Sequence, residues 1–178
     1  MDAIAQAVVD FIAQNRAWAF WVALVFAAAE TTALVSILIP STAILIGVGA
    51  FVATGALDFL PIWAGASVGA VIGSTFSWWL GLRHGSRILG LWPLRDHPDL
   101  VDQGRGAFVR WGTWAIIVGH FVGPLRPVVF LLCGMAPMPL WRFQLFNIPG
   151  ALAWAWAMPM TGAVGGDLIG WLWQALPF

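Results

Sequence analysis

The chain begins with a short segment whose apolar residues recur at the spacing of one helical face. In residues 1–16 these positions are Ile4, Val8, Phe11 and Ile12. This spacing predicts an amphipathic helix that lies on a membrane surface. The apolar run that follows does not stop at signal-peptide length, so we do not expect a secretory signal.

A long apolar run starts at residue 17 and is broken near its middle. Its charged residues are Glu30 and Asp58. The uncharged stretch 31–57 would measure about 40 Å as one helix, longer than the roughly 30 Å hydrocarbon core. Pro40 interrupts it, because proline lacks a backbone donor and disfavours helix at the preceding residue. The pattern predicts a re-entrant hairpin over 17–57.

A conventional transmembrane span is predicted over 59–82, which carries no charge. Residues 83–110 form the only long polar region and hold five of the eight arginines. The positive-inside rule places this region in the cytoplasm. Its acidic cluster indicates either a solvated helix start, capped by Asp96 with Pro98 in the first turn, or a metal site formed by Asp96, His97, Asp99 and Asp102. We favour the helix start and expect no metal.

A second break follows the polar region. Nine uncharged residues after Arg110 reach about 15 Å, half the hydrocarbon thickness, so His120 is expected near the membrane midplane. Pro124 then breaks the helix after Gly123. Because Pro127 follows Arg126 directly, we expect Arg126 on a non-helical turn at the tip of a second hairpin.

This second hairpin, over 111–137, is followed by a span over 143–166 and an apolar tail over 167–178. The span is interrupted by Pro149 and Pro159. The order of surface helix, broken hairpin and span thus occurs twice, as in transporters built from inverted repeats with a site at the midplane. Chance likeness of two apolar stretches is the alternative. We predict a single all-α integral membrane domain over 1–178 with two opposed re-entrant hairpins.

Composition supports a membrane protein. The chain is 61% hydrophobic and 9% charged, with a mean hydropathy of +0.87, whereas soluble domains carry about 25% charged residues. Zero net charge argues against nucleic acid as a partner. Cys133 is the single cysteine, which excludes an internal disulfide and carries no metal-site spacing.

Glu30 and Arg126 are the candidate functional charges. A charge at membrane depth costs roughly 2.5–3.5 kcal/mol or more, so it usually faces a cavity or a partner. Glu30 could exchange a proton with one side at a time. Arg126 stays charged, and its planar fork suits a phosphate. The structural alternatives are a protonated, packed Glu30, or Arg126 paired with Glu30 or backbone carbonyls. An anion could also displace the carboxylate from such a pair.

Other polar residues near the breaks are weaker candidates. His120 either lines the site or is a satisfied core residue, and Ser41 and Thr42 either meet a ligand or cap their own half-helix. Half-helix N-termini at the breaks would favour an anionic group. The sequence shows no Ser/His/acid set, no HExxH and no glycine-rich phosphate loop, so we expect neither an enzyme nor a cofactor.

Several segments resemble the DedA family, also called the VTT or SNARE-associated Golgi family. They are "AAAETTALVSILIPSTAILIGVGAF", "GAVIGSTFSWWLGLRHG", "LRDHPDL" and "GHFVGPLRPVVFLLCGMAPMPLWRFQLFNIPGALAWA". The similarity runs from about residue 26 to residue 158. It implies two opposed re-entrant hairpins with membrane spans, and movement of lipids between leaflets. In bacteria it implies recycling of undecaprenyl phosphate at the cytoplasmic membrane, with proton coupling proposed.

Compared with the family pattern, Glu30 sits at the hairpin glutamate and Arg126 at the second of two arginines. Thr42 stands where members often carry an acid, and His120 where they often carry arginine. Ser74 and Trp78 replace a usual aspartate and tyrosine. His120 could then titrate near neutral pH in place of the missing carboxyl.

We therefore predict a multi-pass transporter of a phosphate-bearing lipid, most specifically undecaprenyl phosphate. Its partners are membrane lipids and, if transport is coupled, protons; the oligomeric state stays open. The predicted binding residues are Arg126, His120, Ser41, Thr42 and Gly123, with Glu30 and His120 as gating residues and Pro40, Pro124 and Pro127 as helix breakers. The alternatives are an uncoupled phospholipid scramblase and a structural membrane factor that moves nothing.

Overall fold

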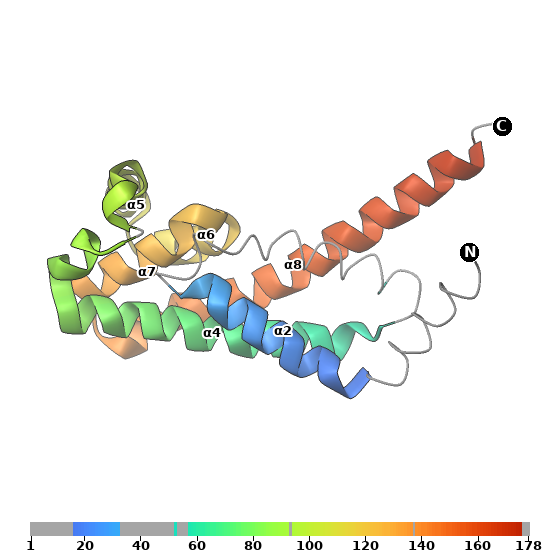
Figure 1. Cartoon of the computed structure of the whole chain (residues 1–178), viewed down its shortest axis with the longest axis horizontal. Coiled ribbons are helices and arrows are strands. Elements are labelled where there is room, and N and C mark those ends of the chain that lie inside the picture. The colour runs from blue at the N-terminus through green and yellow to red at the C-terminus, as the bar shows by residue number, and fades with distance from the viewer. Residues whose placement is uncertain (1–15, 33–51, 53–56, 93, 137, 176–178) are drawn as a thin grey trace.

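The computed structural model describes residues 16–32, 52, 57–92, 94–136 and 138–175, with the main chain alone at both ends, 16–17 and 163–175. In this part of the chain every regular element is a helix (Figure 1). The predicted surface helix and the residues Pro40, Ser41 and Thr42 lie outside the described residues. The first hairpin and the inverted repeat therefore stay predictions.

Two apolar helices pack closely because one of them presents glycines. α2 (Arg16–Thr31) lies along α4 (Phe59–His84). The bounds of α4 are close to those of the predicted span, 59–82. A Cβ atom on Gly65 or Gly69 would run into a main-chain carbonyl of α2. Small residues four positions apart allow such close approach of backbones in membrane helices.

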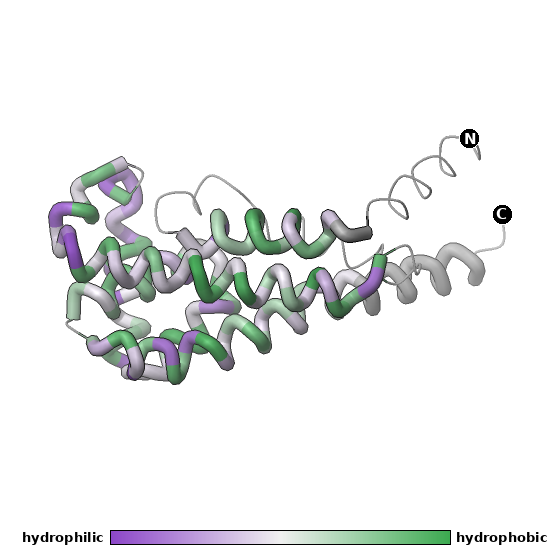
Figure 2. Tube along the Cα trace, turned by 90° about the horizontal axis from the view of Figure 1, so that it is seen from below, coloured by the Kyte–Doolittle hydropathy of each residue, from purple (hydrophilic) through white to green (hydrophobic). Residues whose placement is uncertain are grey.

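The polar region forms short helices at one end of the molecule, where Figure 2 shows hydrophilic residues gathering. These are η1 (Gly85–Gly90), η2 (Leu94–Asp96) and α5 (Pro98–Trp111). The prediction that Asp96 caps α5 is wrong. His97 is the N-cap, because Pro98 suits the first helical position and the residue before it becomes the cap.

Two of the acidic residues of this region contact arginines. Asp96 lies 3.4 Å from Arg95, and Asp102 lies 3.7 Å from Arg105, both as exposed pairs. Within the described residues no group of His, Cys, Asp and Glu is arranged to hold a metal ion.

The second predicted break is a short interruption between two helices. After η3 (Gly112–Trp114), α6 (Ala115–Phe121) leads through η4 (Gly123–Leu125) into α7 (Arg126–Met135). The prediction that Arg126 sits on a non-helical turn is wrong, since Arg126 starts α7 with φ −48° and ψ −60°. Pro127 is tolerated there because first-turn N–H groups need no helical acceptor.

The last helix is longer than predicted. α8 (Leu140–Ala175) runs without interruption through Pro149 and Pro159, where we expected a broken span and then a tail. Neighbouring groups can compensate for proline in apolar helices, so such helices need not break. The indole N–H of Trp63 on α4 donates to the Leu152 carbonyl of α8 at 3.2 Å.

α7 is the central helix, and its residues 126–134 are all buried. It packs against α4, α5 and α6. Many large apolar side chains instead face outward on α2, α4 and α8, including Trp21, Ile72 and Leu145. Among the described residues one helical stretch, Phe59–Gly90, is long and apolar enough to cross a membrane.

Candidate functional site

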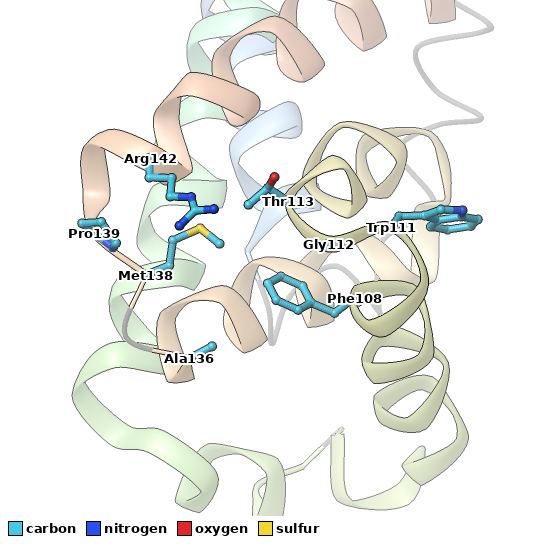
Figure 3. Close-up of a pocket in the computed structure, with 8 residues that line it drawn as sticks. All are labelled: Phe108, Trp111, Gly112, Thr113, Ala136, Met138, Pro139 and Arg142. Atoms are coloured by element: carbon cyan, nitrogen blue, oxygen red, sulfur yellow. The ribbon is translucent and has the colours of Figure 1, made fainter.

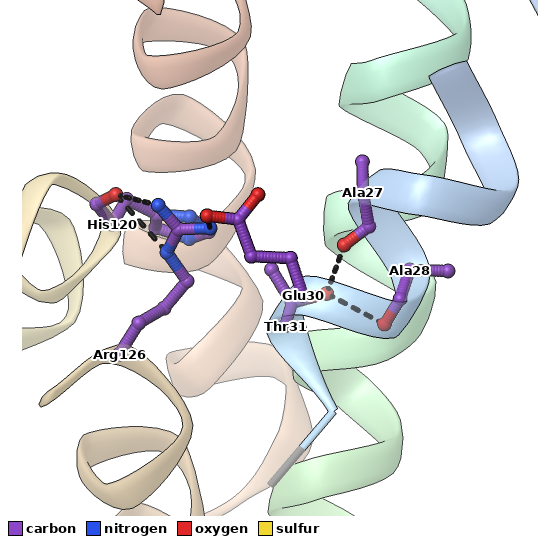
Figure 4. Close-up of polar contacts among 6 residues, drawn as sticks. All are labelled: Ala27, Ala28, Glu30, Thr31, His120 and Arg126. Carbon is purple, nitrogen blue, oxygen red and sulfur yellow. Dashed lines mark hydrogen bonds and ion pairs between the residues drawn. The ribbon is translucent and has the colours of Figure 1, made fainter. Parts of the chain in front are cut away.

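A buried ion pair joins α2 to α7. Arg126 Nη1 lies 3.1 Å from Glu30 Oε1, and the two side chains are 1% and 4% exposed. Glu30 is the penultimate residue of α2 and Arg126 is the first residue of α7. The fold thus brings together two charges that are far apart in the sequence (Figure 4).

The guanidinium of Arg126 also closes the end of α6. Its Nε and Nη2 atoms donate to the main-chain oxygen of His120 at 3.1 and 2.6 Å. The last carbonyls of a helix lack partners within the helix, and a cation near them is favourable. Arg126 therefore holds the break between α6 and α7 in place.

Both charges lie at helix ends where their own helix dipole disfavours them. A carboxylate at the C-terminus of α2 meets partial negative charge, and a guanidinium at the N-terminus of α7 meets partial positive charge. The pair compensates these costs, which are large at full burial. An anion that replaced the carboxylate would meet Arg126 and the favourable N-terminus of α7 together.

A tryptophan forms one wall of the site. The Arg126 guanidinium carbon lies 4.2 Å from the centroid of the fully buried Trp154 ring on α8. This stacking adds cation–π attraction, which is strongest away from water. With Nε and Nη2 donating to His120, the nitrogen that remains for carboxylate or phosphate oxygens is Nη1, which faces Glu30.

His120 is fully buried and linked to α8 by side-chain amides. Its Nε2 atom lies 3.0 Å from Asn147 Oδ1. The Asn147 amide donates to Gln144 at 2.8 Å, and the Gln144 amide donates to Thr75 on α4 at 2.7 Å. This polar chain runs from half-buried residues inward to His120, whose main-chain oxygen accepts from Arg126.

Hydroxyl groups stabilise the C-terminus of α2, which carries Glu30. Thr31 Oγ1 donates to the Ala27 carbonyl at 2.8 Å, and Ser77 Oγ donates to the Thr31 carbonyl at 2.7 Å. These bonds satisfy carbonyls at the buried end of α2. They fix the turn that carries Glu30.

The structure thus brings together three of the predicted site residues, Glu30, His120 and Arg126. Gly123 lies in η4, and among the described residues nothing lies within 4 Å of the position of a Cβ atom there. Both structural alternatives for Arg126, pairing with Glu30 and with a backbone carbonyl, are present. Phosphate binding by these residues stays a prediction.

The site residues on α8 were not predicted from the sequence. Trp154, Asn147 and Gln144 all contact the predicted residues or one another. One signal could have found the amides, because polar side chains inside an apolar membrane helix usually face the protein interior. Trp154 gave no such signal among thirteen tryptophans.

A separate cavity of about 510 Å³ lies between the end of α5 and the start of α8. Arg142, Met138 and Phe108 point into it, whereas the Trp111 ring points away (Figure 3). None of its lining residues belongs to the buried ion pair. This cavity is thus separate from the buried ion pair.

Comparison with known proteins gives a consistent result. The family model of the VTT domain matches residues 39–172. The inner membrane protein YabI of Escherichia coli is 32% identical over 160 residues, covering 89% of this chain and 63% of that protein. An uncharacterized membrane protein of Buchnera aphidicola is 28% identical over 160 residues, covering 90% of this chain and 62% of that protein. No solved structure matches the chain.

An uncharacterized membrane protein of Mycobacterium tuberculosis is 31% identical over 104 residues, 56% of this chain and 48% of its own length. The chain spans less than two thirds of the length of these relatives. The match to the family model nevertheless covers most of the chain and includes Arg126 of the ion pair. The chain belongs to the VTT-domain, or DedA, family of membrane proteins.

Proposed function

We propose that this protein carries a phosphate-bearing lipid headgroup across the membrane, most specifically that of undecaprenyl phosphate. The observation that supports this proposal best is the buried pair of Arg126 and Glu30, 3.1 Å apart. A buried guanidinium in an apolar protein can bind a phosphate, whereas the hydrocarbon core of the membrane contains no group that can.

In the proposed transport cycle, Arg126 exchanges Glu30 for the lipid phosphate. Glu30 faces Nη1 of Arg126, and in the proposed cycle a phosphate takes its place. Protonation of Glu30 releases this contact, and the lipid phosphate then binds Arg126. Loss of the phosphate to the other leaflet lets Glu30 ionise again, so each cycle moves one proton with the lipid. The site stays close to electrically neutral in both states, which limits the cost of burial.

The lipid tail need not enter the protein. α2, α4 and α8 present large apolar side chains outward, among them Val25, Phe76 and Leu152. A prenyl or acyl chain can remain in the bilayer beside these helices while the headgroup moves through the interior. The gain from sheltering only the headgroup is that the apolar chain never leaves its favoured environment.

The test is translocation in liposomes that contain the purified protein. Labelled undecaprenyl phosphate and labelled phosphatidylethanolamine are compared, with and without a pH gradient. We expect the prenyl phosphate to move, faster with the gradient, and we expect Arg126→Gln and Glu30→Gln to abolish the gradient-driven part. The exposed pair supplies matched controls, Asp102→Asn and Arg105→Gln, which should transport as the wild type does.

Other results would assign a different role. Equal movement of both lipids without any effect of the gradient would indicate an uncoupled scramblase. No movement of either lipid, by protein that keeps its helical circular dichroism signal, would indicate a structural membrane factor.

A further inference from the structure

The hydrogen bonds between α4 and α8 have a defined direction. The hydroxyl of Thr75 lies 2.5 Å from the Val71 carbonyl, which can only accept, so Thr75 must donate its single proton there. The Thr75 oxygen then accepts from the Gln144 amide at 2.7 Å. The direction set at Val71 therefore fixes which end of the Gln144 side chain faces Thr75.

The same direction continues to His120. With its NH₂ group on Thr75, Gln144 offers its oxygen to the Asn147 NH₂ group at 2.8 Å. Asn147 is left with its oxygen facing Nε2 of His120 at 3.0 Å. An amide oxygen only accepts, so Nε2 must carry a proton.

The other ring nitrogen is then an acceptor. His120 is fully buried, and Nδ1 has no hydrogen-bond partner among the described residues. A proton on Nδ1 would create a buried donor without an acceptor and a second cation beside Arg126, and both are costly. The neutral Nε2–H tautomer follows, with a bare lone pair on Nδ1.

Packing holds the ring in this orientation. A Cβ atom added at Gly150 would lie 2.7 Å from His120 Cδ2 and 3.4 Å from Nε2, so this edge of the ring rests on α8. The Phe130 ring lies 4.8 Å from the imidazole, centroid to centroid. The main-chain oxygen of the same residue accepts from Arg126 Nη2 at 2.6 Å, so His120 and the guanidinium meet at the end of α6 (Figure 4).

We propose that Asn147 is a positioning residue that fixes the tautomer of His120, and that His120 Nδ1 accepts a hydrogen bond from a P–OH group of the bound headgroup. This inference rests on the proposed function and assigns residues that would select a phosphate monoester over a phosphodiester. A phosphate monoester in its monoanionic form carries a P–OH group and one negative charge, which match Nδ1 and Arg126. A phosphodiester carries no P–OH and leaves Nδ1 without a donor.

The first arm of the test reads the tautomer directly. The protein is labelled with ¹⁵N-histidine in lipid nanodiscs, in a His84→Gln and His97→Gln background that leaves His120 as the one imidazole. We expect the ¹⁵N spectrum of a neutral Nε2–H ring. Asn147→Leu should shift the ring toward the other tautomer or a mixture, whereas the exposed neighbour variant Ile148→Ala should not. An Nδ1–H ring in the background protein would overturn the proposal.

The second arm measures selectivity at pH 6, where the monoanion of a phosphate monoester is well populated. Binding of dioleoyl phosphatidic acid is compared with binding of dioleoyl phosphatidylglycerol, so the tails are identical and the phosphate differs. We expect the wild type to prefer the monoester. His120→Phe and Asn147→Leu should each reduce this preference roughly tenfold, the effect of one hydrogen bond, while Ile148→Ala keeps it.

The outcomes separate the two claims. An Nε2–H ring with a preference unchanged in His120→Phe would overturn the acceptor role of Nδ1 and leave the proposed function standing. An absence of binding for both lipids in the wild type would overturn the proposed function and the acceptor role together. Inorganic phosphate serves as a third probe, and binding as tight as that of phosphatidic acid would assign the site to free phosphate.

Discussion

At the scale of single residues, the placement of Glu30 and Arg126 is hard to explain by stability alone. Each charge lies at the end of its helix that disfavours it, and both are nearly inaccessible to solvent. Replacing a buried ion pair by apolar residues is often neutral or stabilising. A pair kept in this position therefore suggests a role beyond packing, as expected for a carboxylate that yields to another anion.

The coupling between these two residues can be measured. Glu30→Gln and Arg126→Met should each lower the free energy of unfolding by roughly 3–5 kcal/mol, because each leaves its partner buried without the opposite charge. The double variant should lose clearly less than the sum of the two. The measurement is reversible unfolding in mixed micelles, followed by circular dichroism.

A matched cycle provides the control. Asp102 and Arg105 also form a carboxylate–guanidinium pair, 3.7 Å apart, but on an exposed face of α5. Exposed pairs contribute about 1 kcal/mol or less, so this cycle should show little coupling. Additive losses at Glu30 and Arg126 would mean that the buried contact has no energetic weight.

Sequence reasoning found both charges because a charged residue in an apolar run is conspicuous. It did not find their neighbours on α8. The amide side chains of Asn147 and Gln144 in an apolar helix were a usable signal, whereas Trp154 contacts a residue more than twenty positions away and no local pattern marks such a contact. The choice between pairing and ligand binding for Arg126 also depended on three-dimensional distances.

At the scale of helices, glycines decide how closely α2 approaches α4. Gly65, Gly69 and Gly73 are four residues apart, and a Cβ atom on any of them would strike α2. Backbone contact of this kind gives many weak attractions and orders both helices. It also sets the distance from which Glu30 can reach Arg126.

Overpacking this contact should disrupt the site from a distance. Gly69→Val should lower the free energy of unfolding by about 1–3 kcal/mol, and it should weaken the coupling between Glu30 and Arg126. Repeating the double-variant cycle in this background measures the second effect. Gly106→Val is the control, since open space surrounds Gly106 on α5; a cycle unchanged by Gly69→Val would separate α2–α4 packing from the site.

The helix bounds show which of the prolines in the described residues interrupt a helix, as the sequence predicted, and which do not. The break between α6 and α7 lies at Gly123 and Pro124, as predicted. Pro127, Pro149 and Pro159 lie inside helices instead. Whether a proline ends a helix depends on the position of the residue in the first turn and on neighbouring groups that replace the lost bond, and the sequence alone shows neither.

At the scale of the whole molecule, two surfaces of different character are visible. The long helices α2, α4 and α8 expose large apolar side chains, whereas the short helices at one end are polar (Figure 2). The mean hydropathy of the chain predicted association with a membrane. The relatives that the chain resembles are named membrane proteins, in agreement with this prediction. The placement of the polar region in the cytoplasm rests on its arginines and stays a prediction.

Thiol accessibility tests this division. Ile72 on α4 and Val109 on α5 are 52% and 88% exposed, so size and exposure alone would make both cysteine variants reactive. In membranes we expect Val109→Cys to react with a water-soluble maleimide and Ile72→Cys to stay unlabelled, because lipid covers it. The native Cys133 is buried and provides the unreactive background, and equal labelling of both variants would contradict a lipid-facing α4.

The exchange of Glu30 for a lipid phosphate on Arg126 is tested most directly by equilibrium binding of undecaprenyl phosphate in nanodiscs. A competing carboxylate weakens binding, so Glu30→Gln should bind the lipid more tightly than the wild type, on the order of tenfold, while losing gradient-driven transport. Arg126→Gln should bind it weakly or not at all. Equal or weaker binding by Glu30→Gln, in folded protein, would contradict the exchange and leave the pair as a structural strut.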